Sequence, residues 1–276
     1  MNSTEQLKQI LDKSISSGIN GAKAMTIQVC SLMWMRTIMN YQYRYGGSIY
    51  NSISLLYKEG GIKRFYRGIV PALAQGPLSR FGDTFSNSLA LSICKSNKYL
   101  NQSPIWLQTS FASFFAGTFR IALMPVDATK TILQVEGKNG LNMLKTKIKT
   151  SGPQVLFHGA IATSTATMVG HYPWFMTYNY LNSYLAKYND NRQLVRNAFI
   201  GFTSSVVSDT ISNSLRVIKT TKQTYQHSIS YKETINDIIT KDGYSGLFGR
   251  GLAIRLCTNG IQGLLFSVLW NIFNDK

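Results

Sequence analysis

Two short sequence patterns recur along this chain with a period of about 90 residues. The first is complete only at residues 125–130, where proline, aspartate and lysine stand at P-x-D-x-x-K spacing. Shortened copies at residues 31–36 and 214–219 keep the final base, and they begin 94 residues before and 89 residues after the complete copy. An amide follows each final base at one shared offset, as Asn40, Gln134 and Gln223. Recurrence at a fixed period indicates internal repeats.

The second pattern ends in glycine and occurs at residues 65–68, 156–159 and 248–251. Its final glycines are 91 and 92 residues apart. Because two independent patterns share one period, we divide the chain into three repeats, residues 1–98, 99–190 and 191–276.

Six long windows of the sequence are nearly free of charge: residues 15–35, 69–93, 104–124, 159–181, 199–215 and 251–273. A helix needs about 20 largely apolar residues to cross a bilayer. Many of the windows are rich in Ser, Thr, Asn and Gly, as expected of helices that line a watery path. We therefore expect an all-α membrane protein with six crossings.

The formal net charge of +17 permits a second interpretation, a basic soluble repeat protein that binds nucleic acid. However, most of the lysines and arginines lie in the links between the charge-poor windows. Basic links beside apolar spans are typical of the positive side of a membrane protein and of contacts with anionic lipids. Nucleic-acid binding therefore stays the distant alternative.

No catalytic or cofactor motif accompanies the repeats. The sequence lacks a zinc-protease motif, a P-loop and a dinucleotide fingerprint, and Cys30, Cys94 and Cys257 have no metal-ligand spacing. We expect no enzyme activity, no metal and no cofactor.

The two patterns resemble those of the mitochondrial carrier family, whose three repeats each carry P-x-[DE]-x-x-[KR] and then an aromatic-[KR]-G element. The resemblance covers nearly the whole chain, from about residue 18 to residue 273. It implies six transmembrane helices in three pseudo-threefold repeats, each with a short amphipathic helix on the matrix side. It also implies a multi-pass protein of the mitochondrial inner membrane that moves a small solute and functions as a monomer.

In carriers of this family, acids and bases of the first pattern pair in a ring and close the matrix side. The corresponding residues here are Arg36, Asp127, Lys130, Arg216 and Lys219. Asp127 is the only acid, because Met33 and Arg216 stand at the other two acid positions. At most one salt bridge of the usual ring can form, and Arg216 adds repulsion. We expect a weakened matrix gate, or a gate that waits for an anion to compensate the surplus charge.

The gate on the cytosolic side falls, by the same comparison, on Asn179, Asn182, Asn271 and Asn274, with uncharged counterparts in the first repeat. Hydrogen bonds between amides would have to replace ion pairs there. Such bonds are generally weaker than charge-assisted ones, so we expect a loosely closed cytosolic side.

Substrate contacts in the family come from positions near the middle of the membrane. The corresponding candidates are Gln75, Arg80, Arg120, Thr167, His171, Asp209 and Thr258. Arginines beside a single aspartate make the centre cationic, although Asp83, three residues after Arg80, would also suit as a partner for that arginine. A cationic centre favours a small anionic solute with two or more negative charges.

Nucleotides moved by exchange, as nucleoside or deoxynucleoside di- or triphosphates, are our first candidate for this solute. The arginine fork suits phosphate, and Tyr172, Trp174, Gln75 and Gln262 could contact a base or ring. The triple arginine typical of ADP/ATP carriers is absent, since residues 219–222 are Lys-Thr-Thr-Lys. Carboxylates, phosphate and a charged cofactor are the alternatives.

We expect the glycine-ending pattern to begin the second long helix of each repeat, where free N–H groups attract an anion. The resemblance implies bound membrane lipid, specifically cardiolipin, at Arg67, Gly68, Gly159, Arg250 and Gly251. An ordinary helix-entry turn is the alternative.

Overall fold

The computed structural model describes residues 3–96, 105–188, 190 and 192–274, and within these residues the only regular elements are helices. The long segments are α1 (Ser3–Tyr45), α3 (Ile69–Ser96), α5 (Ile105–Ala122), α6 (Met124–Glu136), α8 (Ala160–Tyr184), α9 (Arg192–Thr224) and α11 (Leu252–Asn274). Shorter helices connect them: α2 (Ile49–Phe65), η1 (Gly137–Asn139), α7 (Gly140–Ser151), η2 (Pro153–Phe157) and α10 (Tyr231–Gly249). The all-helical class predicted from the sequence is confirmed for the described residues.

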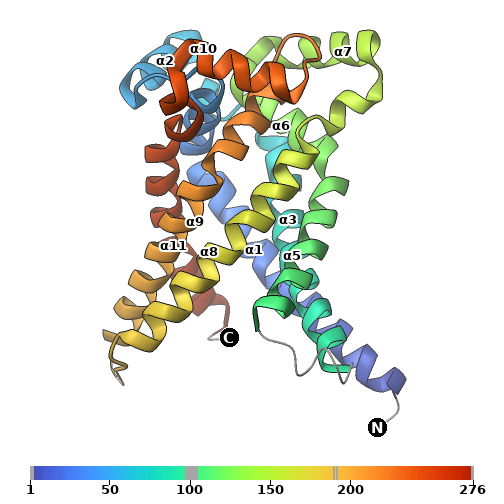
Figure 1. The fold of residues 1–276 in the computed structure, drawn as a ribbon, viewed down its shortest axis with the longest axis vertical. Helices are drawn as coiled ribbons and strands as arrows, with labels where there is room; N and C mark the ends of the chain where they lie inside the picture. The colour runs from blue at the N-terminus through green and yellow to red at the C-terminus, as the bar shows by residue number, and fades with distance from the viewer. Residues whose placement is uncertain (1–2, 97–104, 189, 191, 275–276) are drawn as a thin grey trace.

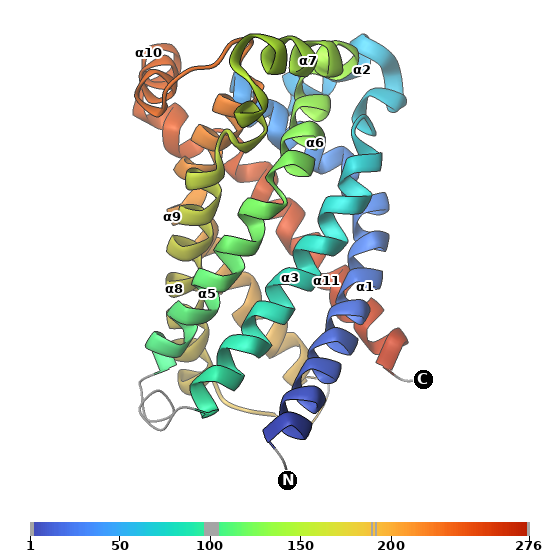
Figure 2. The ribbon, with the colours of Figure 1, turned by 90° about the vertical axis from the view of Figure 1, so that its right-hand side faces the viewer.

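The long helices stand side by side in a closed ring, in which α1, α3, α5, α8, α9 and α11 each pack on the next and α11 packs on α1. Figure 1 and Figure 2 show α2, α7 and α10 together at one end, which we call the short-helix end. Both chain termini lie at the opposite end. In Figure 1 the long helices spread apart toward that opposite end.

The six charge-poor windows of the sequence fall on these long helices, with the third window divided between α5 and the start of α6. Within the described part of the chain, no helix combines the length and the apolar character that crossing a bilayer requires. Membrane crossing therefore stays a prediction from the sequence.

Proline explains why the first long helix is interrupted only in the second repeat, between α5 and α6. Pro125 occupies the first turn of α6, directly after the break at Leu123 that separates it from α5. Proline has no N–H to donate and clashes with the preceding turn, so it tends to start a new helix. Ser31 and Ser214 occupy the corresponding positions in α1 and α9, and both helices run through them without a break.

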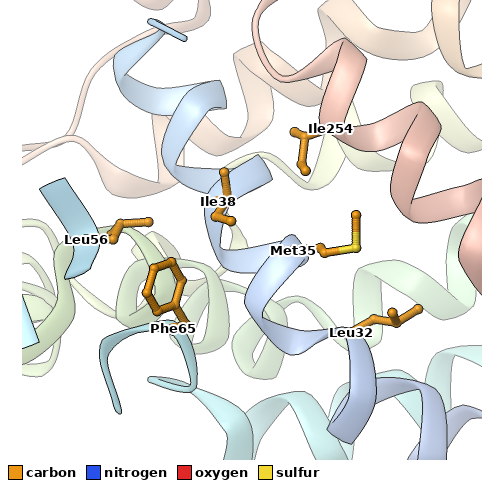
Figure 3. Close-up of a cluster of buried hydrophobic side chains, with 6 residues drawn as sticks. All are labelled: Leu32, Met35, Ile38, Leu56, Phe65 and Ile254. Carbon is orange, nitrogen blue, oxygen red and sulfur yellow. The ribbon is translucent and has the colours of Figure 1, made fainter. Parts of the chain in front are cut away.

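A buried apolar cluster fixes the short-helix end of the first repeat. Its members are Leu32, Met35, Ile38, Leu56, Phe65 and Ile254. Figure 3 shows the first three on α1, Leu56 and Phe65 on α2, and Ile254 approaching from α11. Since α1 begins the chain and α11 ends it, this cluster closes the ring of helices.

The three repeat glycines let the second long helix of each repeat (α3, α8 or α11) pack closely on the next repeat. Gly68, Gly159 and Gly251 have φ of 82°, 84° and 65°, the left-handed region that favours glycine. A Cβ atom on Gly159 would lie 2.9 Å from Cγ of Lys219 in α9, and one on Gly68 would lie 3.0 Å from the backbone oxygen of Lys130 in α6. The glycine-ending pattern of the sequence therefore marks the places where neighbouring repeats are in close contact.

Buried cations make a second set of links between repeats. Arg64 donates to the backbone oxygens of Gln134 (2.7 Å) and Val135 (2.6 Å), at the end of α6. Lys147 donates likewise to the backbone oxygens of Gln223, in the last turn of α9, and of Tyr225, directly after it, at 3.1 and 2.8 Å. A positive charge at a helix C-terminus satisfies free carbonyls and complements the helix dipole.

Arg250 completes this set by donating to the backbone oxygen of Arg44 near the end of α1, at 3.2 Å. Each repeat thus contributes one buried cation to the end of the long helix of the next repeat, in cyclic order. The short-helix end is thereby held together by backbone contacts that do not depend on the degenerate gate residues.

Replacing Gly159 with alanine should destabilise the protein. The left-handed conformation costs a residue with a Cβ atom about 1–2 kcal/mol, and the contact with Lys219 adds to this cost. We expect a lower Tm for purified Gly159→Ala in detergent. Gly249→Ala is the matched control, because no atom lies within 4 Å of its added Cβ. Equal Tm values for the two variants would contradict the close contact.

Lys147 should make the stability of the fold depend on pH. Burial, aided by the charges of Lys222 and Arg44, lowers the pKa of Lys147 to about 8, below about 10.4 for an unfolded chain. Between these values the unfolded chain binds more protons, so raising the pH favours the folded protein. The Tm of the wild type should rise across this window relative to that of Lys147→Met. Parallel pH profiles would contradict this assignment.

Candidate functional site

The long helices enclose a central cavity of 660 Å³, a size typical of sites for small ligands. The charged side chains in its wall are Arg36, Asp83, Arg120, Asp127, Lys130, Arg216, Lys219 and Arg255. Asp209 lies behind this wall and pairs with Arg255. Counting Asp209, the described residues give six bases against three acids, so the cavity has three surplus positive charges.

The carboxylate of Asp127 joins two repeats at the floor of the cavity, next to the short-helix end. Its Oδ1 atom lies 3.0 Å from Nζ of Lys130, and its Oδ2 atom lies 2.5 Å from Nζ of Lys219. Gln223 also donates to it at 3.4 Å, and Lys130 donates to Gln75 at 3.1 Å. Among the described gate residues, Asp127–Lys219 is the one ion pair between repeats. The sequence analysis allowed at most one salt bridge of this ring.

The other gate positions lack such a carboxylate. Met33 is buried, and its sulfur accepts a hydrogen bond from Gln134 at 3.3 Å. Arg36 donates to the Oε1 atom of Gln262 at 2.9 Å. Arg216 lines the cavity, yet its Nε atom is buried without a hydrogen-bond partner in the described structure.

Arg255 is a cavity residue that the sequence analysis did not single out. Its NH2 atom lies 2.6 Å from Oδ1 of Asp209, and its NH1 atom donates to the hydroxyl of Tyr43 at 3.4 Å. Asn259 donates to the second oxygen of Asp209. The available signal was position: Arg255 stands one helical turn before the candidate Thr258 and is the lone charge of its window.

The predicted candidates Gln75, Arg120 and Thr258 line the cavity, but Arg120 is not a free charge. It pairs with Asp83 of α3 at 2.7 and 3.3 Å, although the sequence spacing suggested Arg80 as the partner of Asp83. The side chain of Arg80 lies outside the described residues. The hydroxyl of Thr258 donates to the backbone oxygen of Ile254 at 2.6 Å.

Two further candidates lie behind the cavity wall in the described structure. Thr167 is buried, and its hydroxyl donates to the backbone oxygen of Thr163 at 3.0 Å. His171 meets Ser113 of α5 at 2.7 Å through Nδ1 and so joins α8 to α5. Their neighbours Thr163 and Ala166 line the cavity instead.

Aromatic side chains form part of the wall beside α8 and α9. Trp174 lines the cavity, its indole N–H donates to Ser205 at 3.3 Å, and its ring stacks on Tyr178 with 5.1 Å between centroids. Tyr172, which the sequence offered as another ring contact, is exposed and lies away from the described cavity wall.

The predicted cytosolic gate shows a different bond from the expected amide pair. Asn182 accepts from Arg196 at 2.9 Å through Oδ1 and at 2.7 Å through its backbone oxygen, which joins α8 of the second repeat to α9 of the third. Asn179 is exposed. The side chains of Asn271 and Asn274 lie outside the described residues.

The expected lipid contacts differ in how much side chain they leave free. Arg67 and Gly68 are half-buried, and Gly159 is buried at the start of α8. Arg250 is also buried and donates to Asp242 at 2.7 Å, next to a second pocket of 410 Å³ that includes Gly251. Arg250 is therefore committed to internal bonds, and Gly251, like Gly159, is buried.

A protein-family model described as mitochondrial carrier protein matches residues 102–189 and, a second time, residues 190–275. Together the two matches cover more than half of the chain. No curated protein sequence matches the chain.

Replacing Asp127 with asparagine should destabilise the protein strongly. Lys130 and Lys219 would then lose their shared counter-charge in a largely buried place, which typically costs about 3 kcal/mol or more. We expect a clearly lower Tm in detergent. Asp190→Asn is the matched control, because its pair with Arg192 is solvent-exposed and contributes about 1 kcal/mol at most. Similar losses in both variants would contradict this role.

Proposed function

Because the chain belongs to the mitochondrial carrier family, whose members are solute transporters rather than enzymes, we propose that it exchanges anionic metabolites by alternating access. In this proposal the ring of long helices supplies six crossings of the mitochondrial inner membrane, arranged as repeats 1–98, 99–190 and 191–276. The short-helix end faces the matrix, and the chain works as a monomer. Family membership favours this account over the nucleic-acid-binding alternative.

The surplus of positive charge in the cavity is the observation that carries the proposal. Among the described residues six bases face three acids there, and the paired groups are largely buried, where unbalanced charge costs more than in bulk water. A solute with two or more negative charges relieves this cost, whereas a cation adds to it. The expected substrate is therefore a polyvalent anion.

Nucleoside or deoxynucleoside di- and triphosphates fit the remaining features of the cavity. Trp174 offers an aromatic face to a planar base, and arginine forks such as that of Arg255 match phosphate oxygens. Carboxylates, phosphate or a charged cofactor would satisfy the charge of the cavity. Unless they carry a ring, they would not stack on Trp174.

Alternating access requires that the substrate stabilise one state of the carrier more than another. The Asp127–Lys219 pair holds α6 to α9 in the closed short-helix end and must separate before the cavity can open there. The cation-to-carbonyl contacts of Arg64, Lys147 and Arg250 also link repeats at this end. We propose that binding of the anion changes the relative stability of the closed and open states of this end.

Membrane lipids are the proposed second partner. Several long helices expose large apolar side chains, among them Val70, Ile161, Val195 and Leu264, which suit contact with acyl chains. The repeat glycines Gly68, Gly159 and Gly251 precede the starts of α3, α8 and α11, where the helix dipole favours a phosphate headgroup such as that of cardiolipin.

Exchange in liposomes tests the proposal directly. The purified protein is reconstituted, the vesicles are preloaded with one solute, and uptake is followed for nucleotides, dicarboxylates and phosphate outside. We expect saturable uptake of nucleoside di- or triphosphates that requires an internal nucleotide. Uptake of dicarboxylates or phosphate alone would replace the nucleotide proposal, and uptake of no anion would refute the function.

Trp174→Ala should raise the KM for nucleotides about tenfold, because stacking of a base on an aromatic ring contributes about 1–3 kcal/mol. Trp34→Ala is the matched control, since Trp34 is partly exposed and stands outside the cavity wall. Equal KM values for the two variants would contradict a contact between Trp174 and the base.

A further inference from the structure

Three arginines face the same cavity from three different helices, between the third repeat and the first. Arg36 belongs to α1, Arg216 to α9 and Arg255 to α11, and all three line the cavity wall. Like charges that share one cavity wall repel one another, so this group of arginines favours a negatively charged ligand.

These three cations have one carboxylate among the described residues. Asp209 binds Arg255 at 2.6 Å, and Arg36 has the neutral amide oxygen of Gln262 at 2.9 Å. No hydrogen bond or ion pair engages Arg216 in the described structure, and the Nε atoms of Arg216 and Arg255 are buried without partners. The cluster therefore carries two uncompensated charges and unused donors.

The neighbouring interface between the second and third repeats shows what is missing. There the acid of the second repeat, Asp127, binds the base of the third, Lys219, at 2.5 Å. If the acid of each repeat pairs with the base of the next, position 216 of the third repeat should provide an acid for Arg36 of the first. Arg216 occupies that position, so the cavity wall has a second cation in place of the carboxylate that would join the repeats.

We propose that a doubly charged oxyanion of the substrate binds between Arg36, Arg216 and Arg255 and takes the place of the missing carboxylate. This inference rests on the proposed transport of anions and assigns a site to the anionic group. A phosphate ester and a dicarboxylate both have the required chemistry, since guanidinium forks bind either group through paired N–H···O bonds.

The bound oxyanion has a structural consequence beyond recognition. It joins α1, α9 and α11, as Asp127 joins α6 and α9, and so completes the closure of the short-helix end. Without the anion, repulsion between Arg36 and Arg216 weakens this interface. The empty carrier lacks an ionic link at this interface, and the bound oxyanion supplies one.

Thermal unfolding of the full chain in detergent tests this site without requiring transport. Pyrophosphate, succinate and chloride are titrated at matched ionic strength. We expect pyrophosphate or succinate, but not chloride, to raise the Tm saturably. A response to pyrophosphate alone assigns the site to phosphate groups, and a response to succinate alone assigns it to dicarboxylates. No response to either overturns the proposal.

Arg216→Glu supplies the missing carboxylate from the protein itself. We expect this variant to have a raised Tm without added anion and to bind the effective dianion at least about tenfold more weakly. Arg216→Gln removes one charge without adding an acid, so its affinity should also fall while its anion-free Tm gains less. Arg192→Glu, an exposed charge reversal, should keep the response of the wild type.

An unchanged response in Arg216→Gln would overturn the site even if Arg216→Glu failed to fold. The two proposals fail separately. Anion uptake in liposomes without an Arg216-dependent Tm response refutes the site and leaves transport standing. An Arg216-dependent response without uptake of any anion refutes transport and leaves the site standing.

Discussion

One carboxylate, that of Asp127, balances two lysines at the point where the second and third repeats meet. The remaining arrangement of the cavity follows from the scarcity of such groups. Arg255 and Arg120 each have an aspartate partner, but Arg36 and Arg216 have none among the described residues. An ion pair of the protein therefore joins the second repeat to the third. In our proposal, the corresponding link between the third repeat and the first depends on an anion bound in the cavity.

The backbone contacts at the short-helix end explain how the fold tolerates such imbalance. The repeat glycines let α3, α8 and α11 approach the first long helix of the next repeat. Arg64, Lys147 and Arg250 bind the carbonyls at the end of that helix. These links need glycine geometry and a positive charge but no acid of the gate, since Arg64 and Arg250 pair with Glu59 and Asp242 instead. The packing of the repeats at the short-helix end can therefore be kept while the charged residues of the gate change.

The sequence predicted the helical class, the helix starts at Gly68, Gly159 and Gly251, and the single acid of the gate, because these depend on local conformation and on the repeat period. It did not predict the Arg120–Asp83 pair, the bond from Asn182 to Arg196 or the importance of Arg255. Those depend on side-chain direction between helices that are distant in sequence, which spacing along one helix does not determine.

Equilibrium binding of a matched series of ligands tests the central claim most directly. The series runs from an uncharged nucleoside through its mono-, di- and triphosphate, with binding measured on the purified chain at constant ionic strength. A cavity with surplus positive charge predicts that affinity rises with each added phosphate and that the nucleoside binds weakest. Equal affinity along the series, or tighter binding of the nucleoside, would contradict the account.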